Sequence, residues 1–354
     1  MANSSDKHLH IEAIQTVTPG RAAEPGQARR ISLPSSPISA GTLLGSHAHI
    51  ILYYKKSTKE DMVATLAAQL KESLNHMLAE EPLLSGRLRR DREKDGYWEI
   101  KYNDSGVRLV QVVAETSMDE FLGGEDRDAK EKMLAYWMDI KQEDPQFWPL
   151  FYVQVTEFQG DGYSIGISWS VLLTDHLFMT RFLKKWATSH KQMQAQGQFS
   201  EANIFHLSYF KNSGRIPIDY HYTRSTTSRT ILYKAPQSSD SQALLHHLLE
   251  TCDANVSEFT LFVNDHSGDC LKVENFSKAG GSRMPVNRFL GKLSVAGWDE
   301  LEAGDVDFVA ENKPVLVSCQ VVPFGGHEGL LVAMLPSHQT DSELMISVTV
   351  PLED

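Results

Sequence analysis

The clearest structural signal in the chain is the run Phe151–Trp186, FYVQVTEFQGDGYSIGISWSVLLTDHLFMTRFLKKW. Its first nine residues alternate between apolar and polar side chains, which is typical of a β-strand with one buried face. The Gly-Asp-Gly at 160–162 is turn chemistry, because glycine adopts positive φ at little cost. The apolar run from Tyr163 to Leu173 predicts a second strand that is buried on both faces. The run therefore predicts a β-hairpin.

The second strand leads directly into an amphipathic helix. Thr174 or Asp175 can cap this helix, because a short side-chain oxygen accepts hydrogen bonds from the free N–H groups of the first turn. The apolar residues that follow at helical spacing are Leu177, Phe178, Phe182, Leu183 and Trp186. The corner between strand and helix falls at residues 172–176. Many folds place their chemistry at such a corner, so functional side chains are expected there.

The first half of the chain contains further strand and helix signals. HIILYY at 49–54 predicts a strand. Ser57 and Glu60 fit a capping box, and apolar residues then recur on one helical face as far as Ala79. A second helix is predicted over residues 130–140.

Polar runs predict loops and a boundary between domains. Residues 27–36 predict a surface loop in which Arg29 and Arg30 face solvent. Residues 190–228 predict a crossover, because apolar density falls there. The predicted division is an N-terminal domain at 1–190, a linker at 191–228 and a C-terminal domain at 229–354. Strands are predicted in the second half at 228–234, 259–263, 270–273, 315–322, 330–335 and 344–351.

Composition restricts the class of protein. The 354 residues are 41% hydrophobic, which is enough for a sizeable core and two domains. The net charge of −12 argues against a nucleic-acid binder, which needs a basic face. Cys252, Cys270 and Cys319 form neither a metal-binding spacing nor a disulfide framework, so we expect no metal and a reducing compartment. We also expect no signal peptide and no membrane span.

Three blocks together resemble the plant BAHD acyltransferases, also called HxxxD-type acyltransferases. They are GISWSVLLTD at 166–175, LLSGR at 83–87 followed by NDSGV at 103–107, and a late segment in which Asp-Phe at 307–308 and Lys-Pro at 313–314 match. The resemblance implies a two-domain α/β fold like that of chloramphenicol acetyltransferase, with mixed sheets flanked by helices. It also implies a monomer that takes acyl-CoA as a possible ligand and needs no cofactor. The second domain is shorter than in the family, and the tight Gly-Trp-Gly turn of the late segment is missing.

The resemblance places the family's catalytic histidine at position 171, where this chain has valine. Acyl transfer needs a base for the acceptor's proton, and valine has no lone pair to supply one. General base catalysis contributes roughly two to four orders of magnitude, so we expect the standard reaction to be nearly lost. Asp175 keeps the family's aspartate, and we interpret it as a helix cap paired with an arginine. His176 replaces the usual glycine and is the alternative base, although it lies past the corner.

Within the family, the chain is most similar to the ECERIFERUM/Glossy-type wax proteins. The shared features are Gly-Ile-Ser-Trp at 166–169, NDSGVR at 103–108 and the missing Gly-Trp-Gly turn. The resemblance implies an accessory role in elongating very-long-chain fatty acids for cuticular wax. The partner would be a condensing enzyme of fatty-acid elongation. The present protein would be cytoplasmic and would associate with the endoplasmic reticulum through this partner. Two alternatives remain: an active acyl-CoA-dependent transferase that acylates an alcohol or amine, and a truncated, inactive family member.

Overall fold

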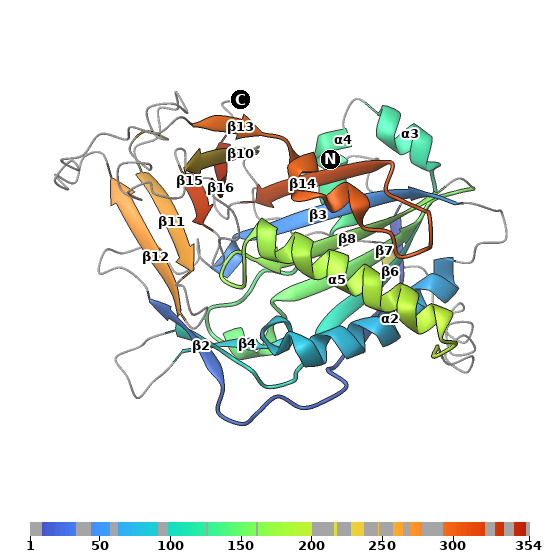
Figure 1. Ribbon diagram of the computed structural model, residues 1–354, viewed down its shortest axis with the longest axis horizontal. Helices are drawn as coiled ribbons and strands as arrows, with labels where there is room; N and C mark the ends of the chain where they lie inside the picture. The colour runs from blue at the N-terminus through green and yellow to red at the C-terminus, as the bar shows by residue number, and fades with distance from the viewer. Residues whose placement is uncertain are drawn as a thin grey trace.

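The structure is a computed structural model. It describes residues 9–32, 44–56, 63–90, 98–124, 127–160, 162–199, 216–217, 228–236, 247, 258–264, 270–277, 293–322, 330–335 and 343–351. Within these residues the chain forms two β-sheets, with helices packed against the first (Figure 1). This is the mixed α/β architecture that the sequence predicts.

The first sheet has seven strands and contains the predicted hairpin as β7 and β8. In spatial order its strands are β14 (Leu316–Val322), β3 (His47–Lys55), β8 (Gly162–Ser170), β7 (Phe151–Glu157), β6 (Val107–Ala114), β1 (Leu9–Val17) and β9 (Ile216–Pro217). Neighbours run antiparallel except β6 and β7, which are parallel. Gly160 has a φ of 82° in the hairpin turn, as the turn chemistry predicts.

The second sheet has nine strands. In spatial order they are β13 (Ser294–Ala296), β10 (Ser228–Pro236), β16 (Glu343–Pro351), β15 (Leu330–Leu335), β11 (Glu258–Asn264), β12 (Cys270–Ser277), β2 (Ala28–Ser32), β5 (Trp98–Lys101) and β4 (Arg87–Arg90). The pairs β11–β15 and β12–β2 are parallel. The six strands predicted for the second half are all present, although β12 extends to Ser277 rather than ending at residue 273.

The two sheets exchange strands between the halves of the chain. β14 comes from the second half but pairs with β3 in the first sheet. β2, β4 and β5 come from the first half but extend the second sheet beyond β12, and Figure 1 shows β2 at the end of β12. Each sheet therefore needs both halves of the sequence. The division into domains at 190–228 stays a prediction, and α5 (His176–Ala195) continues into the predicted linker.

The helices cover the two faces of the first sheet. Besides α5 they are α2 (Val63–Glu80), α3 (Met118–Gly123) and α4 (Arg127–Glu131), with short 3-10 turns η2 (Pro82–Ser85), η3 (Lys132–Leu134), η4 (Pro145–Phe147), η6 (Trp298–Leu301) and η7 (Ala303–Asp305). α2 and α5 lie side by side on one face (Figure 1). The predicted helix from Ser57 is confirmed as α2, whereas its capping box lies outside the described residues. No described helix is both long and apolar enough to cross a bilayer.

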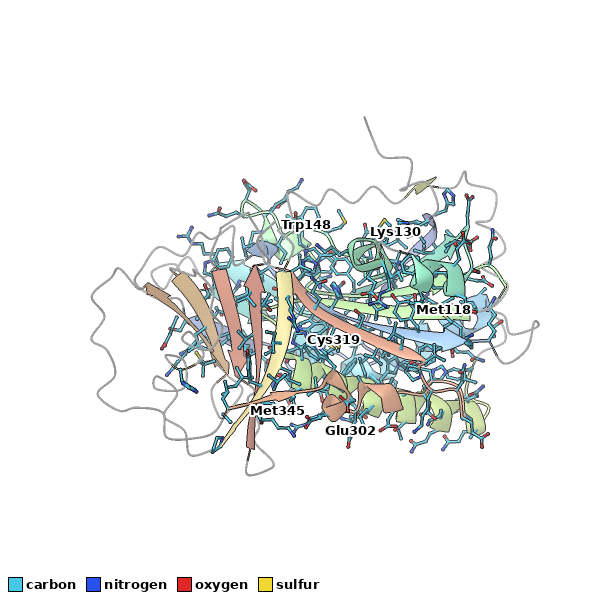
Figure 2. The ribbon with its side chains drawn as sticks, turned by 90° about the horizontal axis from the view of Figure 1, so that it is seen from above. Met118, Lys130, Trp148, Glu302, Cys319 and Met345 are labelled. Atoms are coloured by element: carbon cyan, nitrogen blue, oxygen red, sulfur yellow. The ribbon has the colours of Figure 1, made fainter. Side chains whose placement is uncertain are left out.

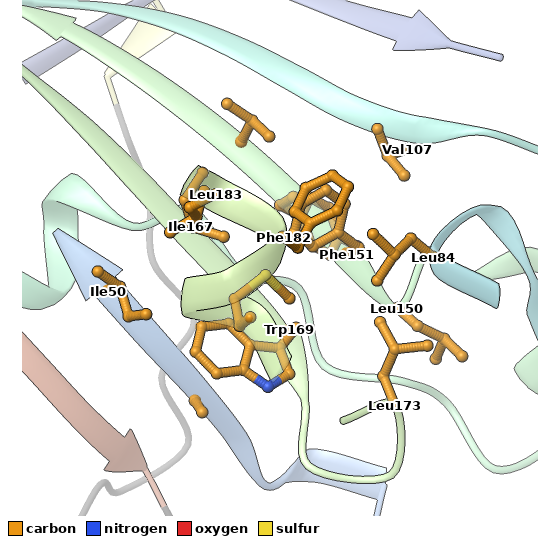
Figure 3. Close-up of a cluster of buried hydrophobic side chains, with 14 of the residues drawn as sticks. Ile50, Leu84, Val107, Leu150, Phe151, Ile167, Trp169, Leu173, Phe182 and Leu183 are labelled. Carbon is orange, nitrogen blue, oxygen red and sulfur yellow. The ribbon is translucent and has the colours of Figure 1, made fainter. Parts of the chain in front are cut away.

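The main core lies between the first sheet and the helices α2 and α5. Phe151 of β7 packs edge-on against Phe182 of α5, with ring centroids 6.0 Å apart. Figure 3 shows these rings beside Trp169 and Leu183. Each large apolar side chain buried in this way stabilises the fold by about 1.5–3 kcal/mol. This packing fixes α5, and with it the corner where α5 begins.

The helix predicted over 130–140 is largely wrong. α4 ends at Glu131, and η3 ends at Leu134. The chain then runs in an extended form along the face of the first sheet opposite α5. Figure 2 labels Lys130 on this face. Gly166 of β8 permits this close approach, because a Cβ there would lie 1.8 Å from the carbonyl oxygen of Leu134. The Ser168 hydroxyl then donates to the carbonyl of Tyr136. Contact with the sheet thus overrides the helical pattern.

Candidate functional site

Val171, at the position that the resemblance gives to the family's base, lies in a turn between β8 and α5. Val171 follows the end of β8, and its N–H donates to the carbonyl of Ser46 at 3.3 Å. The Leu173 N–H donates back to the Ser170 carbonyl at 2.8 Å, which closes the turn. Val171 is 1% exposed and belongs to the main apolar core together with Leu172 and Leu173. The side chain at this position is therefore packed as core.

Asp175 is the N-cap of α5, as the sequence predicts. Its Oδ1 accepts a hydrogen bond of 2.8 Å from the N–H of Phe178. The carboxyl is buried, and burial raises its pKa, whereas the capping bonds and the charges of Arg29 and Arg181 act in the opposite direction. Asp175 thus holds the start of the helix and attracts two guanidinium groups.

Arg29 reaches the corner from the second sheet. The sequence predicts a solvated side chain in a loop, and this prediction is wrong because Arg29 lies on β2 and is 3% exposed. Its Nη1 donates to the carbonyl of Leu173 at 2.6 Å. Only Arg30, the next residue, faces solvent. The alternation of a paired strand turns one arginine inward and the other outward, and the inner one ties the second sheet to the corner.

His176 is the first residue of α5 and is 2% exposed. Its ring lies between Trp169 and Trp298, with both ring centroids 5.2 Å away. Burial lowers its pKa to about 4, and the backbone of Gln320 acts in the opposite direction. Neither ring nitrogen makes a hydrogen bond of ordinary geometry with another described residue. The imidazole is therefore neutral at pH 7.

Two further histidines flank the corner from β3, and sequence reasoning assigned them no role. His47 is opposite Ser170 and His49 is opposite Ser168. The His47 ring stacks on Trp137 at 4.7 Å, and burial lowers its pKa to about 3. Burial also lowers the pKa of His49 well below its usual range. The period-2 pattern of β3, which puts both on one face next to β8, is the signal that could have identified them.

These pKa values limit what the corner can do chemically. A general base works best when its pKa is near the working pH, and burial lowers the pKa of each of these imidazoles below its usual range. They accept a proton poorly at pH 7, but each still offers one N–H donor and one lone pair. Among the described residues no group of three or more His, Cys, Asp or Glu side chains is arranged to hold a metal ion.

The late family-like segment anchors the far end of α5. Asp307 forms an ion pair with Lys191 of α5. Phe308 packs edge-on against Trp186, with ring centroids 4.7 Å apart. Lys313 pairs locally with Asp305 at 2.7 Å. Asp307 and Phe308 therefore support the helix whose N-cap is Asp175.

Comparison with known proteins places this sequence in a family. The sequence model of the "Transferase family" matches residues 9–228. Protein ECERIFERUM 26-like of Arabidopsis thaliana is 29% identical over 39% of this chain and 31% of its own length. Protein ECERIFERUM 2 of the same plant is 30% identical over 38% of this chain and 32% of its own length. The chain thus spans about a third of the length of these curated relatives.

The chain is also similar to a malonyltransferase and to a synthase of known structure. Phenolic glucoside malonyltransferase 1 of Nicotiana tabacum is 27% identical over 51% of this chain and 40% of its own length. The crystal structure of vinorine synthase is 13% identical, with 97% of this chain and 95% of that chain covered at a TM-score of 0.46. The family match extends over more than half of the sequence and includes the β8–α5 corner. On this basis the chain belongs to the Transferase family, the BAHD acyltransferases.

Proposed function

We propose that this protein is a non-catalytic member of its family and assists the elongation of very-long-chain fatty acyl groups for cuticular wax. The observation that carries the proposal is Val171, which fills the base position with an aliphatic side chain inside the core. An accessory role needs the family's fold but not its proton acceptor, since fold and chemistry are separable.

The neighbouring imidazoles support this proposal. His176 has a pKa of about 4 and His47 a pKa of about 3, both lowered by burial. Each is a much weaker base at pH 7 than a histidine with an ordinary pKa near 6.5. Neither replaces the missing histidine as a base matched to neutral pH.

The relatives give the proposal its biological direction. The ECERIFERUM proteins 26-like, 2 and 26 are among the most similar curated relatives. By this resemblance the partner is a condensing enzyme at the endoplasmic reticulum, and an acyl chain or acyl-CoA is the ligand. The accessory protein would change the length of acyl chain that the condensing enzyme produces.

Co-expression in yeast with a plant condensing enzyme tests the proposal. We expect the fatty-acid profile to contain longer chains when both proteins are present than with the condensing enzyme alone. A Val171→Ala variant is the matched control: it keeps an aliphatic residue at the base position, so the longer chains should persist if the variant accumulates normally. An unchanged profile with well-expressed, folded protein would reject the accessory role.

A second candidate is an active transferase that uses His176. The observation in its favour is that His176 lines a pocket and lacks an ordinary hydrogen-bond partner among the described residues. Its low pKa argues against it, because a weak base gains little of the general-base advantage. Protein-dependent acyl transfer that is lost in His176→Ala would establish this candidate instead.

A further inference from the structure

The strand β14 forms one edge of the first sheet and pairs with β3 on one side only. Among the described residues the two sheets have three other edge strands. β9 and β13 span two and three residues, and β4 reads RLRR. Short length and charge both hinder an edge strand from pairing with another chain. β14 is seven residues long and reads LVSCQVV, without a charge, so it has the least protection against an added strand.

The backbone of β14 turns alternate residues toward β3 and away from it. Val321 faces away, because its N–H donates to the Thr230 hydroxyl at 2.9 Å and its carbonyl accepts from the Ser228 hydroxyl at 3.1 Å. By the alternation of a strand, Val317 and Cys319 also direct their N–H and C=O groups away from β3. Within the described part of the chain, no hydrogen bond satisfies these four groups. Figure 2 labels Cys319 on β14 and draws no described element over the strand.

The side chains along this edge are uncharged or already paired. Val315, the residue before β14, is 53% exposed. Ser318 donates to the Glu131 carboxylate at 2.6 Å, and Tyr53 donates to the same carboxylate at 3.0 Å. A charged side chain placed here would lose hydration without gaining a partner, which is unfavourable. We call the stretch 315–319 the β14 edge, and its chemistry fits an uncharged occupant.

A second copy of this chain does not fit the β14 edge. Two β14 strands can use all four groups on both copies only if Val317 of each bonds to Cys319 of the other. That antiparallel register places Val315 of one copy opposite Val321 of the other, whose N–H and C=O already bond to β10. The occupant must therefore be a short segment that ends before β10, which favours a different protein.

We propose that the β14 edge binds one extended, uncharged segment of a partner protein as an additional strand, through the N–H and C=O groups of Val317 and Cys319. Main-chain hydrogen bonds give such a complex its affinity. Valine and threonine suit the segment, because β-branched residues favour strands. The accessory role proposed above needs a partner surface, whereas the β14 edge can bind a strand whether or not the protein acts in elongation.

NMR titration of the full chain with a blocked Thr-Val-Thr-Val-Thr peptide at millimolar concentration tests the proposal. Labelling with ¹⁵N-cysteine gives one amide signal for each of the three cysteines. We expect the Cys319 amide signal to shift saturably, because its N–H gains an acceptor. The Cys270 signal should stay unchanged, because β12 already lies between β11 and β2. A peptide with lysine and glutamate in place of valine should bind at least about tenfold more weakly.

Two substitutions on the β14 edge locate the binding. Val317→Pro removes an outward N–H but no bond to β3, and it should weaken binding about tenfold, the loss expected for one hydrogen bond. Val317→Thr is its matched control, because it keeps the N–H and the branched side chain. Val315→Lys is a second variant in case Val317→Pro does not fold, since it adds a charge at an exposed position and should also weaken binding. Val295→Lys on β13 is the control for it, because Val295 is 71% exposed.

Several results would overturn the proposal, and none of them depends on acyl chains or on elongation. They are the absence of a saturable Cys319 shift, equal binding of the charged peptide, and unchanged binding in folded Val317→Pro or Val315→Lys. Slow hydrogen exchange of the Cys319 amide in the free protein would also overturn it, because the chain itself would then cover the edge. A dimer in sedimentation that Val315→Lys dissociates would assign the edge to a second copy instead.

Discussion

At the scale of single residues, the corner between β8 and α5 is held together by structural contacts. Val171 packs as core, and Asp175 caps a helix. Arg29 donates to the backbone of the turn from another sheet. Each of these contacts is satisfied without a histidine at position 171.

The cap at Asp175 leads to a prediction about stability. Asp175→Asn keeps an oxygen that can accept from the Phe178 N–H, whereas Asp175→Ala removes it. Both variants lose the negative charge, so their difference isolates the cap. We expect Asp175→Ala to unfold with a free energy about 1 kcal/mol lower than Asp175→Asn in urea titrations. Equal stabilities would show that the capping bond contributes nothing.

At the scale of elements, the close contact between β8 and the segment after η3 depends on one glycine. An added Cβ at Gly166 would meet the Leu134 carbonyl at 1.8 Å, so the two backbones must separate. We expect Gly166→Ala to lower the unfolding free energy by about 1–3 kcal/mol, measured by urea denaturation. Gly123→Ala in α3 is the matched control, because nothing lies within 4 Å of its added Cβ. If Gly123→Ala lowered the unfolding free energy as much as Gly166→Ala, the close contact at Gly166 would not be the cause of the loss.

The same element shows where prediction from sequence succeeds and where it ends. β7, β8 and α5 follow from local periodicity, since each pattern is complete within its own residues. The segment after Leu134 keeps a helical pattern but lies flat, because the deciding contact comes from β8. Arg29 becomes buried only because β2 pairs with β12 and β5, which are distant in sequence. The pocket beside His176 likewise needs β10 and β16, so no local pattern could reveal it.

At the scale of the whole molecule, buried neutral histidines make stability depend on pH. Burial lowers the pKa of His47 to about 3 and the pKa values of His176 and His190 to about 4. In the unfolded chain these histidines bind protons near pH 6.5, whereas in the folded chain they stay neutral to lower pH. The stability that the neutral histidines contribute is therefore present above pH 6.5 and is lost as the pH falls toward 4. Each such group changes the unfolding free energy by about 1.4 kcal/mol per pH unit within this window.

We therefore expect the urea midpoint to fall steeply between pH 7 and pH 5. The strand exchange between the sheets predicts that this loss occurs as one cooperative transition, seen equally by circular dichroism and by tryptophan fluorescence. His176→Phe should reduce the number of protons taken up on unfolding in this pH range by about one, which makes the unfolding free energy less dependent on pH. A midpoint that stays constant or rises on acidification would show that these imidazoles are not neutral in the folded protein.

The most direct test of the central claim is an acyl-transfer assay with purified, folded protein. The protein is incubated at pH 7.4 with acyl-CoA of several chain lengths and a panel of primary alcohols and amines, and release of free CoA is measured. A family member with its histidine in place serves as the positive control. With Val171 at the base position, we predict no release above the protein-free rate. Sustained release that His176→Ala abolishes would contradict the account.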